Sequence, residues 1–217
     1  MIQEKIEELK GKILNLAMLA ENMLDKTKSA VYTNDHLLAN SVITDMEQLV
    51  NRLEMENENR CIEYLALFQP EAADLRTIIS FLKINNNIER IADHAVNIAQ
   101  RIGSFESIKE FKEIKIMFEL SQGMLRQSFD SLAMCDMVKA RGVCRVDAEV
   151  DKSLEVLTDN VLMDLARNPD IVNNALSALL IGRDLERIAD LSTNISEDII
   201  YMLSGKLIKH SCNINSG

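Results

Sequence analysis

Two pairs of carboxylates in this sequence are spaced as if to share one face of a helix. Glu89 and Asp93 form the first pair, and Glu186 and Asp190 form the second. Side chains four residues apart lie about one turn apart on the same side of an α-helix. Like charges at that spacing destabilise a helix unless a cation compensates them. The pairs therefore predict either neighbouring basic side chains or bound metal ions.

The segment before each of these pairs contains a similar pair. Glu47 stands four residues before Asn51, and Asp147 stands four residues before Asp151. On adjacent antiparallel helices, two such rows would face each other. Oxygen ligands of this kind suit magnesium, manganese, calcium or iron, whereas zinc is less favoured because the rows contain neither His nor Cys. The candidate metal ligands are Glu47, Asn51, Glu89, Asp93, Asp147, Asp151, Glu186 and Asp190.

Two other interpretations compete with a metal site. Carboxylates beside Arg90 and Arg187 could form a solvated face, whose exposed ion pairs contribute about 0–1 kcal/mol each. A di-iron enzyme would also use carboxylates in a helical bundle, but that class carries Glu-x-x-His, which does not occur in this sequence. His94 follows Asp93 directly and would point about 100° away from it, so we expect a surface or interface histidine. Glycine-rich phosphate loops, G-x-S-x-G and H-E-x-x-H are also absent from the sequence.

The carboxylate pairs belong to a sequence repeat. Residues 88–93 read Ile-Glu-Arg-Ile-Ala-Asp, and residues 185–190, which lie 97 positions further on, read Leu-Glu-Arg-Ile-Ala-Asp. Asn97 and Asn194 extend the match at the same spacing. Two amphipathic helices would agree by chance at Ile and Leu, but not readily at Glu, Arg, Asp and Asn together. We infer a duplication of the chain, which also favours the metal interpretation because a merely solvated face does not need the same residues twice.

Composition and periodicity predict an all-α fold of two tandem, pseudo-symmetric three-helix bundles with six long helices. Apolar residues make up 47% of the chain, whereas its 7 glycines and 2 prolines are too few for the turns of a β-sandwich or barrel. The expected helices span residues 2–30, 36–67, 70–101, 107–140, 146–166 and 171–204, with a turn at Arg141-Gly142. Residues 1–104 and 105–205 are expected to form the two repeats, and residues 206–217 a short polar tail.

Charge and hydropathy limit the classes of function. A net charge of −10 disfavours binding to nucleic acid, because its phosphates would be repelled. No run of about 18 apolar residues could span a membrane, and the first residues form no apolar signal core. The four cysteines lack C-x-x-C spacing, so we expect reduced, inert thiols. Together these features favour a cytoplasmic protein.

Further segments of the chain are distinctive in the same order along the sequence. They are Gln69-Pro70-Glu71-Ala72-Ala73-Asp74-Leu75-Arg76, both copies of Glu-Arg-Ile-Ala-Asp with the later Asn, residues 147–151 and the ending at residues 201–210. Taken together, and over nearly the whole chain, these segments resemble the PhoU family of phosphate-transport accessory proteins.

The resemblance implies a non-enzymatic regulator of phosphate homeostasis. PhoU proteins consist of two similar three-helix bundles with pseudo-twofold symmetry. They act with the phosphate ABC transporter and a phosphate-sensing histidine kinase, and they restrain phosphate uptake and starvation signalling when phosphate is plentiful. We therefore expect the ATPase subunit of the transporter and the kinase as partners, a homodimer, and contact with the membrane only through those partners.

The resemblance also implies bound metal, because some PhoU proteins hold multinuclear clusters on paired Glu/Asp-x-x-x-Asp motifs. Iron, manganese, magnesium or zinc would then be bound by the four pairs named above. Ala92 and Ala189 stand where the family often has glycine, and alanine favours the helix. Asn51 is neutral where the second half has Asp151, so the site that uses Glu47 and Asn51 is expected to be the weaker one. The alternative function is a carboxylate-bridged metalloprotein with storage or redox activity.

Overall fold

The computed structural model describes residues 2–103 and 111–207, and nearly all of them are helical. The first half contains α1 (Ile2–Thr33), α2 (His36–Ser41), a π-helical segment η1 (Val42–Met46), α3 (Glu47–Phe68) and α4 (Ala72–Gln100). The second half contains α5 (Lys112–Met134), α6 (Met137–Arg167), a 3₁₀ turn η2 (Pro169–Ile171) and α7 (Val172–Ser204). No strand occurs in these described ranges, and none of their helices is long and apolar enough to cross a bilayer. The predicted all-α class is confirmed.

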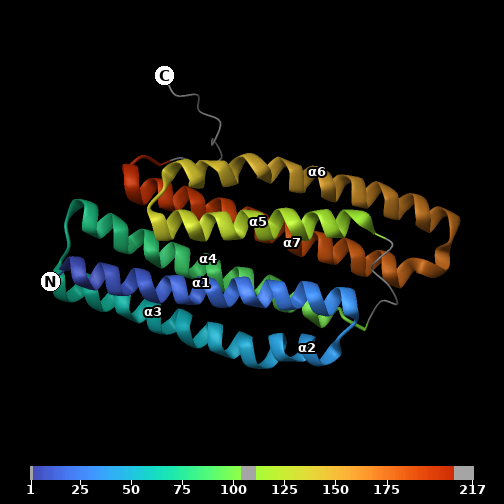
Figure 1. Ribbon diagram of the computed structural model, residues 1–217, viewed down its shortest axis with the longest axis horizontal. Helices are drawn as coiled ribbons and strands as arrows, with labels where there is room; N and C mark the ends of the chain where they lie inside the picture. The colour runs from blue at the N-terminus through green and yellow to red at the C-terminus, as the bar shows by residue number, and fades with distance from the viewer. Residues whose placement is uncertain (1, 104–110, 208–217) are drawn as a thin grey trace, which may run out of the picture.

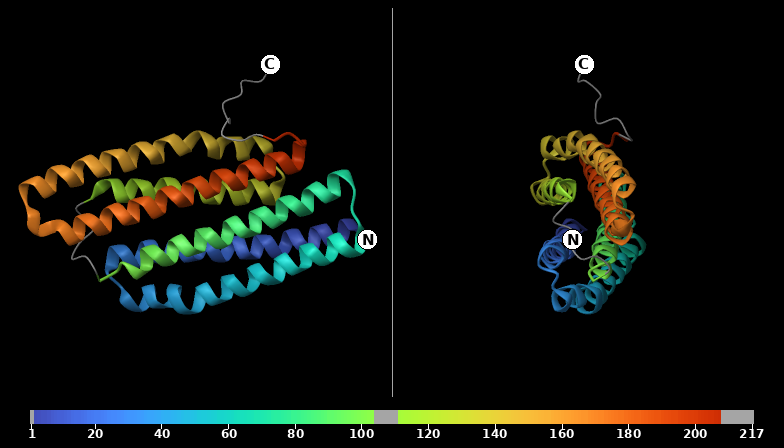
Figure 2. Two further views of the ribbon diagram at one scale, coloured as in Figure 1. Left: turned by 180° about the vertical axis from the view of Figure 1, so that it is seen from behind. Right: turned by 90° about the vertical axis from the view of Figure 1, so that its right-hand side faces the viewer.

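The helices form two three-helix bundles that lie side by side (Figure 1). In the first bundle α1, α3 and α4 pack on one another, and in the second α5, α6 and α7 do so. The two bundles meet along α4 and α7 and along α1 and α5. Seen from one end of the molecule, α4 and α7 lie on one side and α1 and α5 on the other (Figure 2). The tandem three-helix plan predicted from the sequence repeat is therefore confirmed.

One hydrophobic core runs through both bundles, because each long helix buries a stripe of apolar residues. Leu9, Ile13 and Leu16 of α1 are fully buried, as their alternation by four and three predicts. Phe81 of α4 and Phe118 of α5 are the bulkiest fully buried side chains in the described part of the chain. The buried residues form one continuous cluster. This cluster fixes how the helices lie against one another and hence where their polar faces meet.

The two halves close their first hairpin with the same corner. Asn34 (φ 52°) and Cys135 (φ 54°) adopt the left-handed conformation. The next residue in each half, Asp35 or Asp136, caps the following helix by accepting two backbone amide hydrogen bonds. The amides of Asp35 and Asp136 donate to the carbonyl five residues earlier, at 3.0 and 2.9 Å. The duplication therefore extends to the backbone hydrogen bonds.

This second corner shows that the turn expected at Arg141-Gly142 is wrong. α5 ends at Met134 and α6 begins at Met137, so Gly142 lies inside a helix. The expected helices 107–140 and 146–166 are replaced by α5 and α6. The corner contains neither glycine nor proline; the left-handed Cys135 and the Asp136 cap are sufficient to reverse the chain.

The second expected helix is interrupted by one π-helical turn, η1. Val42, Ile43 and Thr44 are consecutive β-branched residues, whose side chains crowd a regular α-helix. Thr44 Oγ1 donates to the backbone carbonyl of Asn40 at 2.9 Å. A π turn adds a residue to the turn and changes the angular position of everything that follows. The interruption lies directly before Glu47, the first residue of α3.

Other helix ends agree with the signals in the sequence, with one exception. Asn168 caps the turn opened by Pro169, and Gly205 (φ 71°) ends α7 in the left-handed conformation. Pro70 was expected in the first turn of a helix, but it lies outside α4. The chain reverses earlier, because Gln69 adopts φ 44° after α3.

The cysteines only partly match the expectation of reduced thiols. Cys61 is a buried free thiol, and burial raises its pKa to about 12, which makes it inert at neutral pH. Cys135 is an exposed free thiol. Cys144 is disulfide-bonded, so the expectation is wrong at that residue. The expectations for Cys212, for the boundary at residues 104 and 105 and for residues 208–217 of the tail lie outside the described residues.

Candidate functional site

Helices α6 and α7 bring the four candidate ligands of the second half together. Asp147 and Asp151 lie on α6, and Glu186 and Asp190 lie on α7, which packs against it. Burial raises the pKa of Asp147, Asp151 and Glu186, and the negative charge of Asp190 raises all three further. Asp190 therefore lies within electrostatic reach of three other carboxylates.

One basic side chain of the repeated motif compensates part of this charge. Arg187 Nη1 donates to Asp190 Oδ2 at 2.9 Å, and Arg187 Nε lies 3.5 Å from Glu186 Oε2. Thr193 Oγ1 donates to Asp147 Oδ1 at 3.3 Å. Arg187 is largely exposed, so each of its ion pairs contributes no more than about 1 kcal/mol. A single guanidinium among four carboxylates leaves a net negative charge on this face.

In the first half the structure groups a different set of residues. Glu89 and Asp93 share a face of α4, and burial raises the pKa of both carboxyls. The charges of Asp93 and of Glu54 on α3 raise the pKa of Glu89 further. Glu47 and Asn51 lie on α3, the helix that packs against α4. Glu54, which the predicted set omits, stands one turn beyond Asn51 and could have been found by extending the row.

A buried amide network positions Glu54 beside α4. Asn57 Nδ2 donates to Asn85 Oδ1 at 3.0 Å. Asn85 Nδ2 donates to the backbone carbonyl and to Oε1 of Glu54, at 3.0 and 2.9 Å. Both asparagines are buried, and buried amides are costly unless they find partners. The network therefore fixes the register of α3 against α4.

The second-half row has the donor chemistry of a cation site but not its assembled geometry. Carboxylate oxygens are the ligands that magnesium, manganese and calcium prefer. Within residues 2–103 and 111–207, however, no three His, Cys, Asp or Glu side chains are arranged so that they could hold a metal ion. Arg187 already pairs with two of the four carboxylates. A metal ion would have to displace this guanidinium and draw the carboxylates together.

An open groove of about 800 Å³ lies between α6 and α7, beside the acidic row. Its wall combines carboxylates and leucines and includes Asp151, Leu154, Glu155, Thr158, Asp159, Leu176, Leu179, Leu180, Arg183 and Glu186. A groove that combines apolar and acidic groups suits a partner surface with basic and apolar side chains.

A carboxylate that the sequence reasoning missed lies between the two bundles. Asp184 of α7 is only 9% exposed. Its Oδ1 is 2.9 Å from Nδ1 of His94, and its Oδ2 is 3.7 Å from Nε of Arg101. His94 is therefore an interface histidine, in agreement with the sequence prediction. Asp184 lies before the repeated motif, and the first half has no acidic residue at the equivalent position. The spacing of the carboxylates therefore did not identify Asp184.

Sequence comparison relates both bundles to one family. A family model described as the PhoU domain matches residues 13–102 and residues 114–199. The chain is similar to the phosphate-specific transport system accessory protein PhoU homolog 2 of Thermotoga maritima, with 31% identity over 96% of this chain and 90% of the relative. It is also 32% identical to the corresponding PhoU homolog of Aquifex aeolicus, over 95% of both chains.

Solved structures agree with the sequence relatives. The crystal structure of PhoU from Pseudomonas aeruginosa has a TM-score of 0.90 and 28% identity, and the match covers 95% of this chain and 100% of that one. The phosphate transport system regulatory protein PhoU from Streptococcus pneumoniae has a TM-score of 0.89 and 26% identity, with 96% and 100% of the two chains covered. The similarity thus extends through both bundles.

Proposed function

Because this chain belongs to the PhoU family, we propose that it is a non-enzymatic regulator of phosphate homeostasis. It restrains uptake by the phosphate ABC transporter and lowers phosphate-starvation signalling through a sensor histidine kinase. The observation that carries the proposal is the match of both halves to the PhoU domain. The relatives are named as accessory proteins of the phosphate-specific transport system, which supports a role in the regulation of phosphate transport.

The regulator acts by binding, and the groove between α6 and α7 is the contact surface for the ATPase subunit of the transporter. Its leucines supply apolar area, and its carboxylates attract basic side chains. A partner helix with apolar and basic residues on one face would fill such a groove. The presence of both kinds of group in one groove supports this assignment.

Binding to the purified ATPase subunit and to the cytoplasmic part of the kinase tests the proposal. We expect binding to both, measured at high and low phosphate. The charge reversal Glu155→Lys with Asp159→Lys should weaken binding of the ATPase subunit about tenfold or more, because both carboxylates line the groove. Glu7→Lys on the exposed side of α1 is the matched control and should leave binding unchanged.

The outcomes distinguish failure of the regulatory role from failure of the groove as the contact surface. If the chain binds neither partner at high or at low phosphate, the proposed regulatory role is rejected. Binding that the double reversal does not weaken would keep the regulator but move its contact away from the groove.

The acidic rows are also proposed to bind a hard cation, with Asp147, Asp151, Glu186 and Asp190 as the stronger site. Their excess negative charge and the raised pKa values of three of them support this assignment. The weaker site comprises Glu47, Asn51, Glu89 and Asp93. Iron, manganese, magnesium or zinc would neutralise the acidic face and thereby favour one partner-binding state.

Removing two ligands should remove metal from the second half. After reconstitution with iron or manganese, Glu186→Gln combined with Asp190→Asn is expected to lower the bound metal measured by elemental analysis. Glu149→Gln changes an exposed carboxylate of α6 and should leave the metal content as it is. A parent protein without metal after reconstitution would eliminate the cation site and leave the regulator untouched. Metal-dependent turnover by the loaded protein would instead favour the storage or redox alternative.

A further inference from the structure

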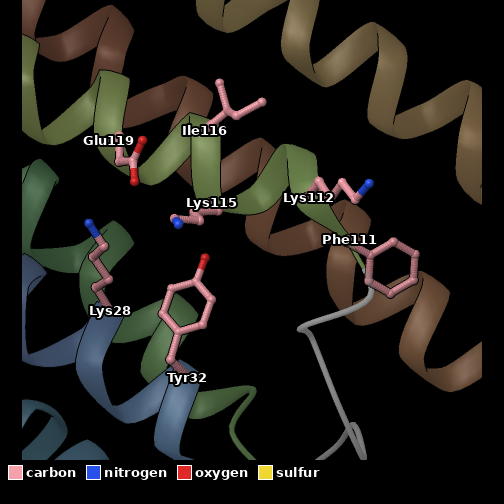
Figure 3. Close-up of a pocket in the computed structure, with 7 residues that line it drawn as sticks. All are labelled: Lys28, Tyr32, Phe111, Lys112, Lys115, Ile116 and Glu119. Atoms are coloured by element: carbon pink, nitrogen blue, oxygen red, sulfur yellow. The ribbon is translucent and has the colours of Figure 1, made fainter.

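A cavity of about 680 Å³ lies on the seam between α1 and α5 (Figure 3), and no residue of the acidic rows lines it. Lys28 and Tyr32 come from α1, and Lys112, Lys115 and Glu119 come from α5. Three lysines against one glutamate give this cavity a positive charge, although the chain as a whole has a net charge of −10. A local excess of cations in an acidic protein indicates an anionic ligand.

Tyr32 carries a donor that the protein itself does not use. Its hydroxyl oxygen is buried without a hydrogen-bond partner among the described residues, and it points into the cavity (Figure 3). Its ring packs against Phe118, with centroids 6.1 Å apart, a contact that needs no hydroxyl. Burial and the charge of Glu119 raise the pKa of Tyr32 to about 12, so the hydroxyl keeps its proton. A buried donor without an acceptor is costly, and a ligand oxygen would satisfy it.

Two ammonium groups approach the same space. Lys28 Nζ donates to Gln122 Oε1 at 2.8 Å, and Gln122 Nε2 donates to Asp25 Oδ1 at 2.6 Å. These bonds hold Lys28 at the wall of the cavity and leave its other N–H groups available to a ligand. Figure 3 shows the ammonium group of Lys115 directed into the space between the side chains of Lys28 and Tyr32.

The start of α5 adds to the positive potential. This helix begins at Lys112, and no side chain caps its first turn. The first backbone amides of a helix carry partial positive charge and attract anions. Phe111 and Ile116 also line the cavity and add apolar surface to its wall.

We propose that this cavity binds a protonated phosphate group, either inorganic hydrogen phosphate or the monoanion of a phosphomonoester, through Lys28, Lys115 and the Tyr32 hydroxyl. Glu119 selects the ligand. Its carboxylate accepts a hydrogen bond from the P–OH of hydrogen phosphate, whereas it repels an oxyanion such as sulfate, which has no proton at neutral pH. The site goes beyond the regulatory role proposed above, because it would let the chain itself respond to phosphate without a metal ion. A ligand held by α1 and α5 would also stabilise one arrangement of the two bundles.

Titration of the full chain with inorganic phosphate and with sulfate tests the site. A chelator is present throughout, so that phosphate bridged by a metal ion on the acidic rows does not contribute. We expect phosphate to bind about tenfold or more tightly than sulfate. Tyr32→Phe and Lys115→Met should each weaken phosphate binding about tenfold, because each removes a donor to the anion. Lys152→Met on the exposed side of α6 is the control and should bind as the parent does.

One further variant, Glu119→Gln, and a melting measurement of Tyr32→Phe separate recognition from folding. Glu119→Gln should tighten sulfate binding and reduce the preference for phosphate, since the repelling charge is gone. Tyr32→Phe should melt at the same temperature as the parent or higher when no ligand is present, because it removes an unsatisfied buried hydroxyl. A purely structural role for Tyr32 would lower the melting temperature instead.

Vesicles that contain phosphatidic acid distinguish the two sources of a phosphomonoester. Vesicle binding that Lys115→Met abolishes, without binding of free phosphate, would assign the site to a lipid headgroup. If neither phosphate nor these vesicles bind, or if Tyr32→Phe and Lys115→Met bind as the parent does, the proposal is overturned. Neither result depends on the ATPase and kinase measurements, so failure of this site and failure of the regulatory role are distinguishable.

Discussion

Replacing Phe118 by alanine is expected to lower the free energy of unfolding by about 4 kcal/mol. Phe118 is fully buried in α5, and its ring lies against that of Tyr32 on α1. The substitution removes apolar contact area and leaves a void where the two bundles meet. Helices from both bundles surround the void, so the structure can collapse into it only partly.

Denaturant unfolding measures this loss as a lower midpoint with an unchanged slope. Met134→Ala is the matched control, because Met134 belongs to the same helix but is 63% exposed. Its effect should stay within about 0.5 kcal/mol. A loss below about 1 kcal/mol for Phe118→Ala would contradict a core that is continuous between the bundles.

The second large effect is expected at Asp184, whose replacement by alanine should cost about 3 kcal/mol. Its carboxylate is buried between α7 and α4 and faces both His94 and Arg101. Alanine would leave these two basic groups in the interface without the carboxylate that compensates them. The expected loss of stability lies at the lower end of the range for breaking a buried ion pair. The reason is that the side chains of His94 and Arg101 are 21% and 30% exposed.

Asp184→Asn keeps the size of the side chain and one acceptor oxygen, so its cost should lie between those of the parent and of alanine. Glu8→Ala breaks an exposed pair with Lys5 at 2.8 Å and should change the stability much less, because water screens that pair. Hydrogen exchange at the contact between α4 and α7 should accelerate in Asp184→Ala. Equal stability of the Asp184→Ala and Glu8→Ala variants would show that water screens the interface pairs as fully as it does surface ones.

The helical plan was predictable because local signals and the repeat agree. The apolar stripe that includes Leu9, Ile13 and Leu16 requires a helix, and Asn168 and Gly205 mark ends by their ordinary capping roles. The duplicated motif then places α4 and α7 in equivalent positions. None of these inferences requires knowledge of which helices touch.

The corner between α5 and α6 was missed although the repeat contained the signal. Asp136 occupies the same place as Asp35 and caps its helix in the same way. The sequence analysis predicted the turn at Gly142 instead, because glycine usually weakens a helix. In the structure, the amide group of Gln127, which donates to the carbonyl of Lys139, occupies the space that a Cβ at residue 142 would take. This contact between α5 and α6 is a tertiary property that cannot be read from the sequence alone.

Spacing along single helices predicts which carboxylates share a face, but it does not identify Glu54. Asp147 and Asp190 lie on regular helices, and spacing along those helices was enough to bring their row together. In the first half, the buried Asn57–Asn85 network sets the register of α3 against α4 and holds Glu54 near Glu89. Glu54 lies seven residues, about two turns, beyond Glu47 on the same face of α3. Such a register depends on contacts between helices rather than on spacing within one.

The left-handed corner at Cys135 also provides a natural attachment point for a reporter dye. Its thiol is exposed, and Lys10 Nζ of α1 lies 3.4 Å from its Sγ, so the label would stand where the second bundle touches the first. Cys61 would not compete for a maleimide, because its thiol is buried and protonated. Fluorescence of a dye on Cys135 would report changes in the spacing of the two bundles.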